Sequence, residues 1–442
     1  MVPWTGVQLL IQVAGAIVLA RSVARKVPSV WVVRVGGALT VPLVVVSLVF
    51  GPPKSAPTST MATAPAAGPD VLLVTVDTLR ADHIGEHTPA IRQLASEGVQ
   101  YRRALASSPW TLPSMASMLT GHTSLTHQAG RPLSAISPNV RTPLLADMPV
   151  LAEDFAAAGY RTGAIVSNVF LSADYGIARG FQTYENPLFT RAMAGNFKEN
   201  VVARAMLRVM PPTMFGDPRA EAMVDTALSW WSDSTSQAPR FLWLHLVDPH
   251  APWKADPAKL ELQSLLEELG GHPEPNPDGT LIGEQFGAVH EVRSGKAWLQ
   301  PWDRTRLKDM YRGQVAYTDT ALGRLFDAMR SQERPVTVVF TADHGEEFWD
   351  HGGFEHGHDF YTELTRVPMI FWGHGVAEGG NVDEPVGLID VAPTLLSLAG
   401  LPPREVEGVA LAGVRGEEEK DLPPRFSENN LYDLPAVLVE DG

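Results

Sequence analysis

The segment Asp70-Val-Leu-Leu-Val-Thr-Val-Asp77-Thr-Leu-Arg80 joins an apolar run to a group of polar residues, and this pattern indicates the fold class. Residues 71–76 are aliphatic or β-branched and too few for a helix, so they predict a buried strand of a parallel sheet. Two later runs, residues 241–247 and 336–340, have the same character. Each of the three is followed at once by polar residues, which we therefore expect at the carboxyl ends of neighbouring strands.

Helix and strand patterns alternate around these runs. The sequence predicts helices over residues 88–97, 112–119 and 150–158, and a further strand over residues 163–166. This order is typical of a doubly wound α/β fold, with a mostly parallel sheet flanked by helices. Ligands of such sheets bind outside the carboxyl ends of the strands, where the loops converge. We therefore expect the functional site at that edge.

The first 50 residues predict a membrane anchor. Residues 2–20 and 35–50 contain no charged side chain, and a bilayer span takes about 20 apolar residues. Either one or two transmembrane helices would fit. The basic residues between the two apolar runs should stay cytoplasmic, which sends the rest of the chain to the periplasmic or cell-surface side. A cleaved signal peptide fits less well, because its positive charge would precede the apolar run.

Composition divides the rest of the chain into a linker and one large domain. Residues 51–69 are rich in Pro, Ala, Ser and Thr and predict a linker. Residues 70–442 are enough for one catalytic domain. Within it, residues 256–302 are polar and rich in Pro, Gly and Glu, which predicts a surface insertion.

Two counts exclude classes of function. The chain contains no cysteine, which excludes cysteine-based chemistry. Its formal net charge of -15 argues against nucleic acid as a partner, because neutralising phosphates requires a basic surface.

The polar residues after the strands predict a metal site. Asp77, Asp343 and His344 offer the oxygen and imidazole ligands that Zn, Mn, Mg or Ca accept. Thr111 would complete this set, because coordination lowers the pKa of an alcohol and makes it a nucleophile. Pro113 places Thr111 near the start of a helix, whose dipole favours negative charge. The alternative is that Thr111 only caps that helix.

Several blocks of sequence, in this order along the chain, resemble the sulfatase family of the alkaline phosphatase superfamily. The blocks are Thr88-Pro-Ala-Ile-Arg-Gln-Leu-Ala-Ser-Glu-Gly98, Thr111-Leu-Pro-Ser114, Leu119-Thr-Gly121, Asp343-His344-Gly345-Glu346, Arg366-Val-Pro368 and residues 388–400. The resemblance spans roughly residues 71–408 and implies an alkaline-phosphatase-like fold. It also implies an ester substrate, either a small molecule or a lipid or glycan.

One position departs from the pattern of the members that cleave sulfate esters. Those members usually have Cys or Ser at the position of Thr111, which is oxidised to formylglycine, and Arg at the position of Met115. Threonine is not a substrate for that oxidation, and losing the Arg removes a bidentate anion clamp. The chain instead resembles the threonine-nucleophile members, which include phosphodiesterases and phosphoethanolamine or glycerophosphate transferases of the bacterial envelope.

A second set of polar residues could hold another cation or contact the substrate. It contains Asp248, His250, His351, His356 and His358. The resemblance gives His250 a substrate-contacting role, and His358 lies one position off a substrate-binding Lys of the formylglycine sulfatases. We predict that His250 and His358 bind substrate and take part in catalysis, with one metal site and a possible second. Asp248 could be a ligand or only a turn residue before Pro249.

Other polar residues are expected to stabilise the fold. Arg80 and Asp82 could orient Asp77 or tie the loop by a salt bridge, and the second role is favoured. Asp319 and Asp390 match family positions and are expected to be structural. Asn168, at the end of the strand over residues 163–166, could donate to a substrate oxygen, although an Asn there is usually a turn residue.

These observations predict a metal-dependent hydrolase that cleaves a phosphate or sulfate ester through a metal-bound Thr111. One alternative is a phosphoryl-group transferase, similar to phosphoethanolamine or glycerophosphate transferases, that acts on envelope lipids or glycans. A second alternative is a catalytically inactive, membrane-anchored binding module.

Overall fold

The computed structural model describes residues 68–134, 137–187, 218–251, 292, 301–420, 422–429, 431 and 436–440. All of them belong to one compact unit, made of residues 56–197 and 210–442. The predicted anchor at residues 1–50, nearly all of the predicted linker and most of the predicted insertion lie outside the described residues. Among the helices that are described, none is both long and apolar enough to cross a bilayer.

In the described part of the chain, nine strands form one mixed sheet. They are β1 (Asp70–Val76), β2 (Val99–Leu105), β5 (Arg161–Val166), β6 (Thr183–Glu185), β7 (Arg240–Leu246), β8 (Val336–Ala342), β11 (Arg366–Gly373), β12 (Gly380–Val382) and β13 (Val386–Gly387). Their order is β12-β2-β11-β8-β1-β7-β5-β6, and β13 also pairs with β2. The fully buried β1 lies between β8 and β7 and is parallel to both.

One strand gives the sheet its mixed character. β11 is antiparallel to both β8 and β2. The prediction of a mostly parallel sheet did not include this reversal. Its physical reason is the connection: residues 343–365 link β8 to β11 without the long crossover helix that parallel neighbours require.

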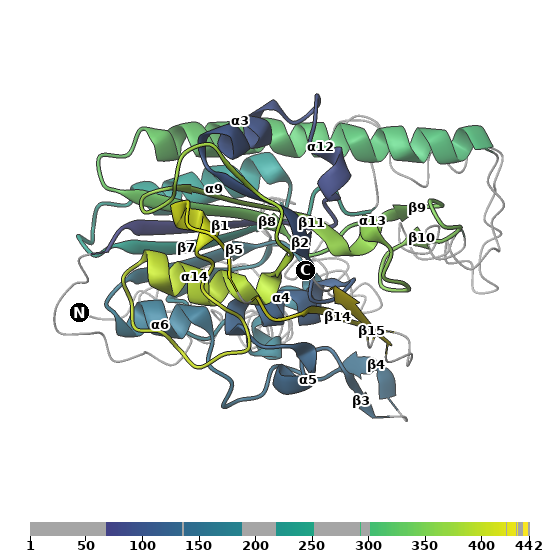
Figure 1. The fold of residues 1–442 in the computed structure, drawn as a ribbon, viewed down its shortest axis with the longest axis horizontal. Helices are drawn as coiled ribbons and strands as arrows, with labels where there is room; N and C mark the ends of the chain where they lie inside the picture. Colours follow the sequence, from purple (N-terminus) through teal and green to yellow (C-terminus); the bar gives the residue numbers. More distant parts are fainter. Residues whose placement is uncertain are drawn as a thin grey trace, which may run out of the picture. The chain divides into compact units, whose positions relative to one another are not determined.

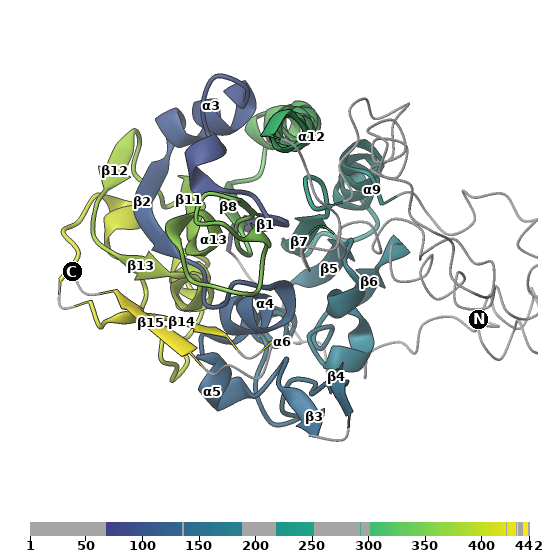
Figure 2. The same ribbon diagram turned by 90° about the vertical axis from the view of Figure 1, so that its right-hand side faces the viewer.

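Helices cover both faces of the sheet (Figures 1 and 2). One face carries α3 (Pro89–Glu97), α9 (Ala220–Ser232) and α12 (Pro301–Arg330), and the other carries α4 (Thr111–Thr120), α6 (Leu151–Ala157) and α14 (Val391–Leu398). Shorter helical segments are η1 (Ala81–His83), α5 (Ser124–His127), η2 (Val169–Leu171), η3 (Ala173–Tyr175), α13 (Thr362–Thr365), η6 (Leu388–Asp390) and η7 (Gly413–Arg415). The layered α/β arrangement that the sequence predicted is confirmed.

Among the residues that the structure describes, three two-stranded sheets lie outside the central one. They pair β3 (Pro132–Ser134) with β4 (Ser137–Arg141), β9 (Glu347–Phe348) with β10 (Phe354–Glu355), and β14 (Arg425–Asn429) with β15 (Ala436–Glu440). The β9–β10 hairpin belongs to the connection between β8 and β11, which also carries several histidines of the predicted second set.

The predicted elements are found within a few residues of their expected bounds. The three apolar runs form β1, β7 and β8, and the predicted helices correspond to α3, α4 and α6. The 30-residue α12 was not predicted, and its first two residues overlap the end of the predicted insertion. α12 packs against α3 and α9.

Candidate metal centre and active site

The loop that follows β1 brings Asp77 to the carboxyl edge of the sheet. Asp77 is fully buried, and its N–H donates to Leu246 O at the end of β7. Thr78 has a φ of +56°, a left-handed conformation that is rare for a β-branched residue. In this conformation the Thr78 N–H donates to Asp343 Oδ1 at 3.0 Å. The loop after β1 is thereby joined directly to the residue that follows β8.

Thr111 is the first residue of α4, as the sequence predicted. Every residue of α4 is buried, and the side chain of Ser114 in the first turn donates to Asp343 O at 2.6 Å. The helix amino-terminus therefore points into the same edge of the sheet, where its dipole favours negative charge. The alternative that Thr111 only caps the helix does not fit, because it lies within the helix and Trp110 precedes it as the N-cap residue.

Asp343 and His344 follow β8, and their hydrogen bonds fix which atoms face the site. Asp343 Oδ1 accepts from the N–H groups of Thr78 and His344. The buried Oδ2 has no hydrogen-bond partner among the described residues. His344 Nδ1 lies 2.9 Å from Gly345 O and must donate to it, because a carbonyl only accepts. The lone pair of a neutral His344 is therefore on Nε2.

Asp77 has the same division between a bonded and an unbonded oxygen. Its Oδ2 lies 2.5 Å from Asn168 Nδ2 and 3.3 Å from His245 Nε2. Asn168 Oδ1 accepts from the Phe170 N–H, so the amide nitrogen of Asn168 is the atom that faces Asp77. Asp77 Oδ1 is buried and accepts no hydrogen bond within the described part of the chain.

The four predicted ligands converge. His344 Nε2 is 3.4 Å from Thr111 Oγ, 3.4 Å from Asp343 Oδ2 and 3.8 Å from Asp77 Oδ1. Metal–ligand bonds of about 2.0–2.2 Å place the donor atoms of a tetrahedral site roughly 3.3–3.6 Å apart. The distances from His344 Nε2 to Thr111 and Asp343 fall in this range, and the distance to Asp77 is slightly longer. These donor atoms are therefore candidates to share one divalent cation.

The two carboxyl groups have opposite pKa shifts. Burial alone would raise the pKa of Asp77, but attraction from His250, His245 and His344 outweighs it and lowers the pKa to about 2. Burial raises the pKa of Asp343, and the neighbouring negative charge of Asp77 raises it further. Two buried carboxylates this close require a positive charge between them to be ionised together, which is what a bound cation would provide.

Two residues near these predicted ligands were not among the predicted site residues. His245 is buried in β7, inside a run that the apolar pattern assigned to the core. Asn168 was considered as a donor to a substrate oxygen, with a turn residue as the favoured alternative, and it lies 3.2 Å from Thr111 Oγ as a donor. The donor atoms of His245, Asp77 and Asp343 lie within 4.8 Å of one another. The sequence offered one signal for His245. It is a histidine two residues before the end of the predicted strand over residues 241–247, close to the edge where the site was expected.

The predicted second set of histidines separates into two groups. The ring of His356 lies 4.4 Å from that of His344 and 5.0 Å from that of His250. His356 Nδ1 also lies 2.9 Å from Oε1 of the buried Glu346. His358 instead contacts Glu347 Oε2 at 2.8 Å. The structure thus brings His250 toward the four ligands together with His356, while His358 pairs with a carboxylate of the β9–β10 hairpin.

The remaining members of that set have structural partners. Asp248 Oδ2 accepts from the N–H of Ala220 at the start of α9, which supports the structural alternative for this residue. His351 Nδ1 lies 2.6 Å from Glu363 Oε1, and its ring stacks on Tyr361. A second group of donor atoms is close enough to hold a cation, on Glu347, His351 and Glu363. However, both carboxylate oxygens of Glu347 already accept hydrogen bonds. Oε1 accepts from the N–H groups of His351 and Gly353, and Oε2 accepts from His358.

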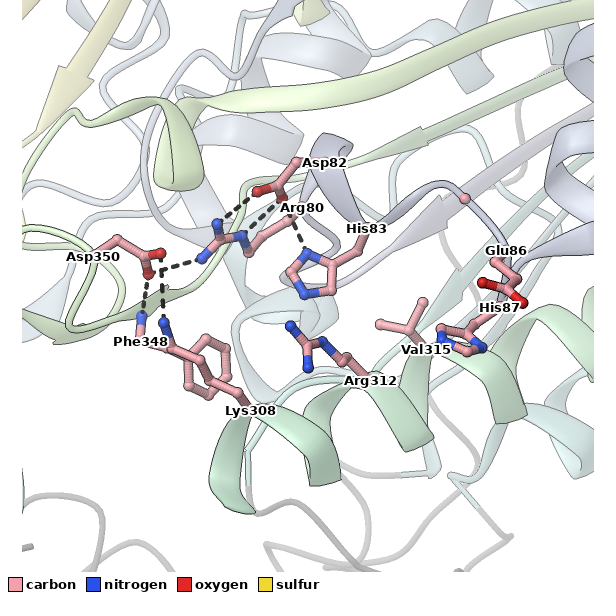
Figure 3. A pocket seen from close by; sticks show the side chains of 11 residues that line it. Arg80, Asp82, His83, Glu86, His87, Lys308, Arg312, Val315, Phe348 and Asp350 are labelled. Atoms are coloured by element: carbon pink, nitrogen blue, oxygen red, sulfur yellow. Dashed lines mark hydrogen bonds and ion pairs between the residues drawn. The ribbon is translucent and has the colours of Figure 1, made fainter. Parts of the chain in front are cut away.

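Arg80 ties the loop after β1 to the loop after β8. Its guanidinium donates to Asp82, to Asp350 and to Glu346 O, and Figure 3 shows it between the two carboxylates. This arrangement agrees with the predicted salt bridge. A polar cavity of about 360 Å³ lies beside it, lined by Arg80, Asp82, His83, Gly85, Glu86, His87, Lys308, Arg312, Val315, Phe348 and Asp350.

Comparisons with known proteins agree on a family. A family model described as sulfatase matches residues 69–401. Arylsulfatase K of Canis lupus familiaris is 24% identical over 375 residues, which are 80% of this chain and 65% of that protein. This chain therefore spans less than two thirds of that relative's length.

Solved structures with similar folds carry several different names. A phosphonate monoester hydrolase from Silicibacter pomeroyi is 23% identical, with a TM-score of 0.57 over 82% of this chain and 79% of that one. The C-terminal periplasmic domain of EcEptC from Escherichia coli, in complex with Zn, is 15% identical, with a TM-score of 0.56 over 87% of this chain and 96% of that one. At these identities the likeness shows the alkaline-phosphatase-like fold.

Proposed function

Because this chain belongs to the sulfatase family, we propose that it is a metal-dependent hydrolase of phosphate or sulfate esters with Thr111 as its nucleophile. The observation that carries this proposal is the convergence of Thr111 Oγ, His344 Nε2 and the two unbonded carboxylate oxygens at the amino-terminus of α4. A cation held by Asp77, Thr111, Asp343 and His344 would supply the charge that lowers the pKa of the Thr111 hydroxyl.

Thr111 and Asn168 perform the first step. The Thr111 hydroxyl gives its proton to solvent, and Oγ attacks phosphorus or sulfur in line with the leaving oxygen, so that one bond to Oγ forms and one ester bond breaks. Asn168 Nδ2, 3.2 Å from Thr111 Oγ, donates to the deprotonated nucleophile and stabilises it. The product of this step is a threonine ester, which water then cleaves to restore Thr111.

His250 and His356 contact the transferred group or the leaving oxygen. The proposal assigns His356 to this role beside His250, in place of the sequence-predicted His358, because its ring lies against His344. The Glu346 carboxylate at 2.9 Å accepts from Nδ1, so Nε2 is the ring nitrogen that can donate a proton to the leaving oxygen when the ring carries both hydrogens.

The sequence favours a phosphoester over a sulfate ester as the substrate. The chain has no cysteine and has threonine in the nucleophile position, whereas the formylglycine route to sulfate esters needs Cys or Ser there. Met115, which takes the place of the family's Arg, is fully buried in α4 and cannot hold an anion.

A phosphoryl-group transferase is the second candidate function. If an acceptor alcohol replaces water in the second step, the same residues transfer the group to a lipid or glycan. The apolar sequences of residues 2–20 and 35–50 favour this candidate, because a membrane anchor would hold the enzyme on the extracytoplasmic side beside such acceptors.

Turnover by the full-length chain tests the proposal. Nitrophenyl phosphate, a phosphodiester and nitrophenyl sulfate are compared with and without Zn, Mn, Mg and Ca, in the wild type, Thr111→Ala and Thr111→Ser. We expect metal-dependent phosphoester cleavage that Thr111→Ala abolishes and Thr111→Ser partly retains. Metal-dependent cleavage that survives in Thr111→Ala would overturn the assignment of the nucleophile. Acceptor-dependent release of the leaving group would identify the transferase.

A further inference from the structure

We propose that His245 is a positioning residue of the metal centre, which holds Asp77 in its ligating orientation through a buried hydrogen-bond chain from Trp243 and Thr75. The inference rests on the proposed metal centre and extends it to residues of the sheet interior. The chain runs from Trp243 to Thr75, then to His245 and to Asp77, and we call it the Trp243–Asp77 chain.

Strand register places all four side chains on one face of the sheet. Thr75 of β1 is paired directly with His245 of β7. Alternate residues of a strand share a face, so Trp243 lies on the same side as His245, and Asp77 on the same side as Thr75. Thr75, Asp77, Trp243 and His245 are all fully buried.

The direction of the hydrogen bonds follows from what each group can donate. Trp243 Nε1 only donates, so Thr75 Oγ accepts at 3.0 Å. The Thr75 hydroxyl lies 2.8 Å from His245 Nδ1 but 3.5 Å from Leu244 O, the only other acceptor that it reaches among the described residues. The shorter contact favours donation to Nδ1. The ring hydrogen is then on Nε2, which donates to Asp77 Oδ2 at 3.3 Å.

The opposite tautomer is unfavourable in this setting. A hydrogen on Nδ1 would turn the lone pair of Nε2 toward the Asp77 carboxylate and leave two acceptors facing each other in a buried site. The Trp243–Asp77 chain therefore specifies an Nε2–H donor. A histidine with its hydrogen on this nitrogen has no lone pair there with which to bind a cation.

The consequence for Asp77 is a fixed carboxylate plane. His245 and Asn168 both donate to Oδ2, which leaves Oδ1 as the oxygen nearest to His344 Nε2. Groups that orient a metal ligand in this way typically change metal affinity by about 10–100-fold when they are removed. His245 is thus expected to act on cation affinity through Asp77.

Metal affinity measured on the full-length chain tests this assignment. The Zn²⁺ dissociation constant is measured for the wild type, His245→Leu, His245→Gln and Phe241→Leu. Gln can place an N–H donor near the position of Nε2, whereas Leu cannot. Phe241 lies on the same strand and stacks on Phe155, so Phe241→Leu controls for a loss of packing in β7.

We expect His245→Leu to weaken Zn²⁺ binding about 10–100-fold, His245→Gln to recover most of this loss, and Phe241→Leu to leave the affinity unchanged. Thr75→Val, which removes the hydroxyl and keeps the shape, should fall between the wild type and His245→Leu. Trp243→Phe should weaken Zn²⁺ binding less than Thr75→Val, because Trp243 is one hydrogen bond further from Asp77 along the chain.

The visible spectrum of the Co²⁺-loaded protein separates positioning from direct ligation. Loss of a nitrogen ligand would change the spectrum, whereas loss of a positioning residue would leave it unchanged at saturating Co²⁺. An altered spectrum in His245→Leu without rescue by Gln would overturn the inference in favour of ligation. An unchanged Zn²⁺ affinity in His245→Leu would also overturn the positioning role of His245, but it would leave the proposed metal centre intact. A wild type that binds neither metal would contradict the proposed function itself.

Discussion

At the scale of single residues, the two buried aspartates show how the site is prepared for a cation. One oxygen of each carboxylate accepts two hydrogen bonds, and the other accepts none from the described residues. The donors come from three loops and one strand, so the orientation of each ligand depends on the packing of the sheet. Binding a cation then requires little rearrangement of the side chains.

Asn168 should affect catalysis more than stability. Asn168→Ala removes the donor to Asp77 Oδ2 and to Thr111 Oγ, so we expect kcat/KM to fall about 10–100-fold with Zn²⁺ present. Asn381→Ala on β12, at the far edge of the sheet, is the matched control and should leave kcat/KM unchanged. Equal activity of the two variants would show that Asn168 is only a turn residue.

His356 and His358 provide a matched pair of variants. His356→Gln removes the ring that lies against His344, and we expect turnover to fall about 10²-fold or more, because a proton donor is lost. His358→Gln removes a contact to Glu347 and should reduce turnover much less. Steady-state rates on a poor and a good leaving group measure the effect, since loss of a proton donor matters most for the poor one. The reverse order of effects would support the sequence prediction for His358.

At the scale of elements, α12 holds the loop that follows β1. This helix lies on the sheet face opposite to α4. The hydroxyl of the buried Tyr311 donates to Thr78 O and accepts from the Arg80 N–H. Thr78 is the residue with the left-handed φ whose N–H binds Asp343. The helix therefore stabilises the strained residue that connects two of the loops with proposed metal ligands.

Removal of that hydroxyl should destabilise the domain. Tyr311→Phe leaves a buried N–H and a buried carbonyl without this partner, and we expect the free energy of unfolding to fall by about 1–3 kcal/mol. Tyr317→Phe, on the same helix and only half-buried, should cost less. Denaturant titration of both variants checks the difference. A Tyr311→Phe variant as stable as the wild type would show that water replaces the hydroxyl.

The elements differ in how well the sequence predicts them. β1, β7 and β8 were predictable because each is a short apolar run that ends at a polar residue, and the proposed ligands Asp77, Asp343 and His344 follow the ends of β1 and β8. β11 looks like any buried strand in sequence, and its antiparallel direction depends on the connection before it. His245 was missed because a buried histidine within an apolar strand has the same pattern as a core residue. His356 and His358 are separated only by the path of the β9–β10 hairpin, which no local pattern determines.

At the scale of the whole molecule, buried histidines link stability to pH. His127 is fully buried, and burial lowers its pKa from 6.5 to about 3. Between these values the unfolded chain binds a proton that the folded chain does not, so the free energy of unfolding falls as the pH falls. The stability that neutral His127 provides is therefore complete above pH 6.5 and is lost progressively toward pH 3.

His127→Gln should weaken this dependence. The wild type should lose up to about 1.4 kcal/mol per pH unit relative to the variant below about pH 6. Denaturant titrations of both proteins at several pH values give the two slopes, and their difference isolates His127 from the other titrating groups. Parallel slopes for the two proteins would mean that His127 is protonated equally in the folded and unfolded states.

A trapped covalent intermediate tests whether Thr111 is the nucleophile. The full-length protein is loaded with Zn²⁺, mixed with an excess of activated phosphodiester, quenched in acid within one turnover and digested with trypsin. Mass analysis of the tryptic peptide over residues 104–141, which remains uncut at Arg131 because Pro132 follows, should show the transferred phosphoryl group on Thr111. If the enzyme turns over and this peptide stays unmodified, or if the phosphoryl group is found on another residue, Thr111 is not the nucleophile.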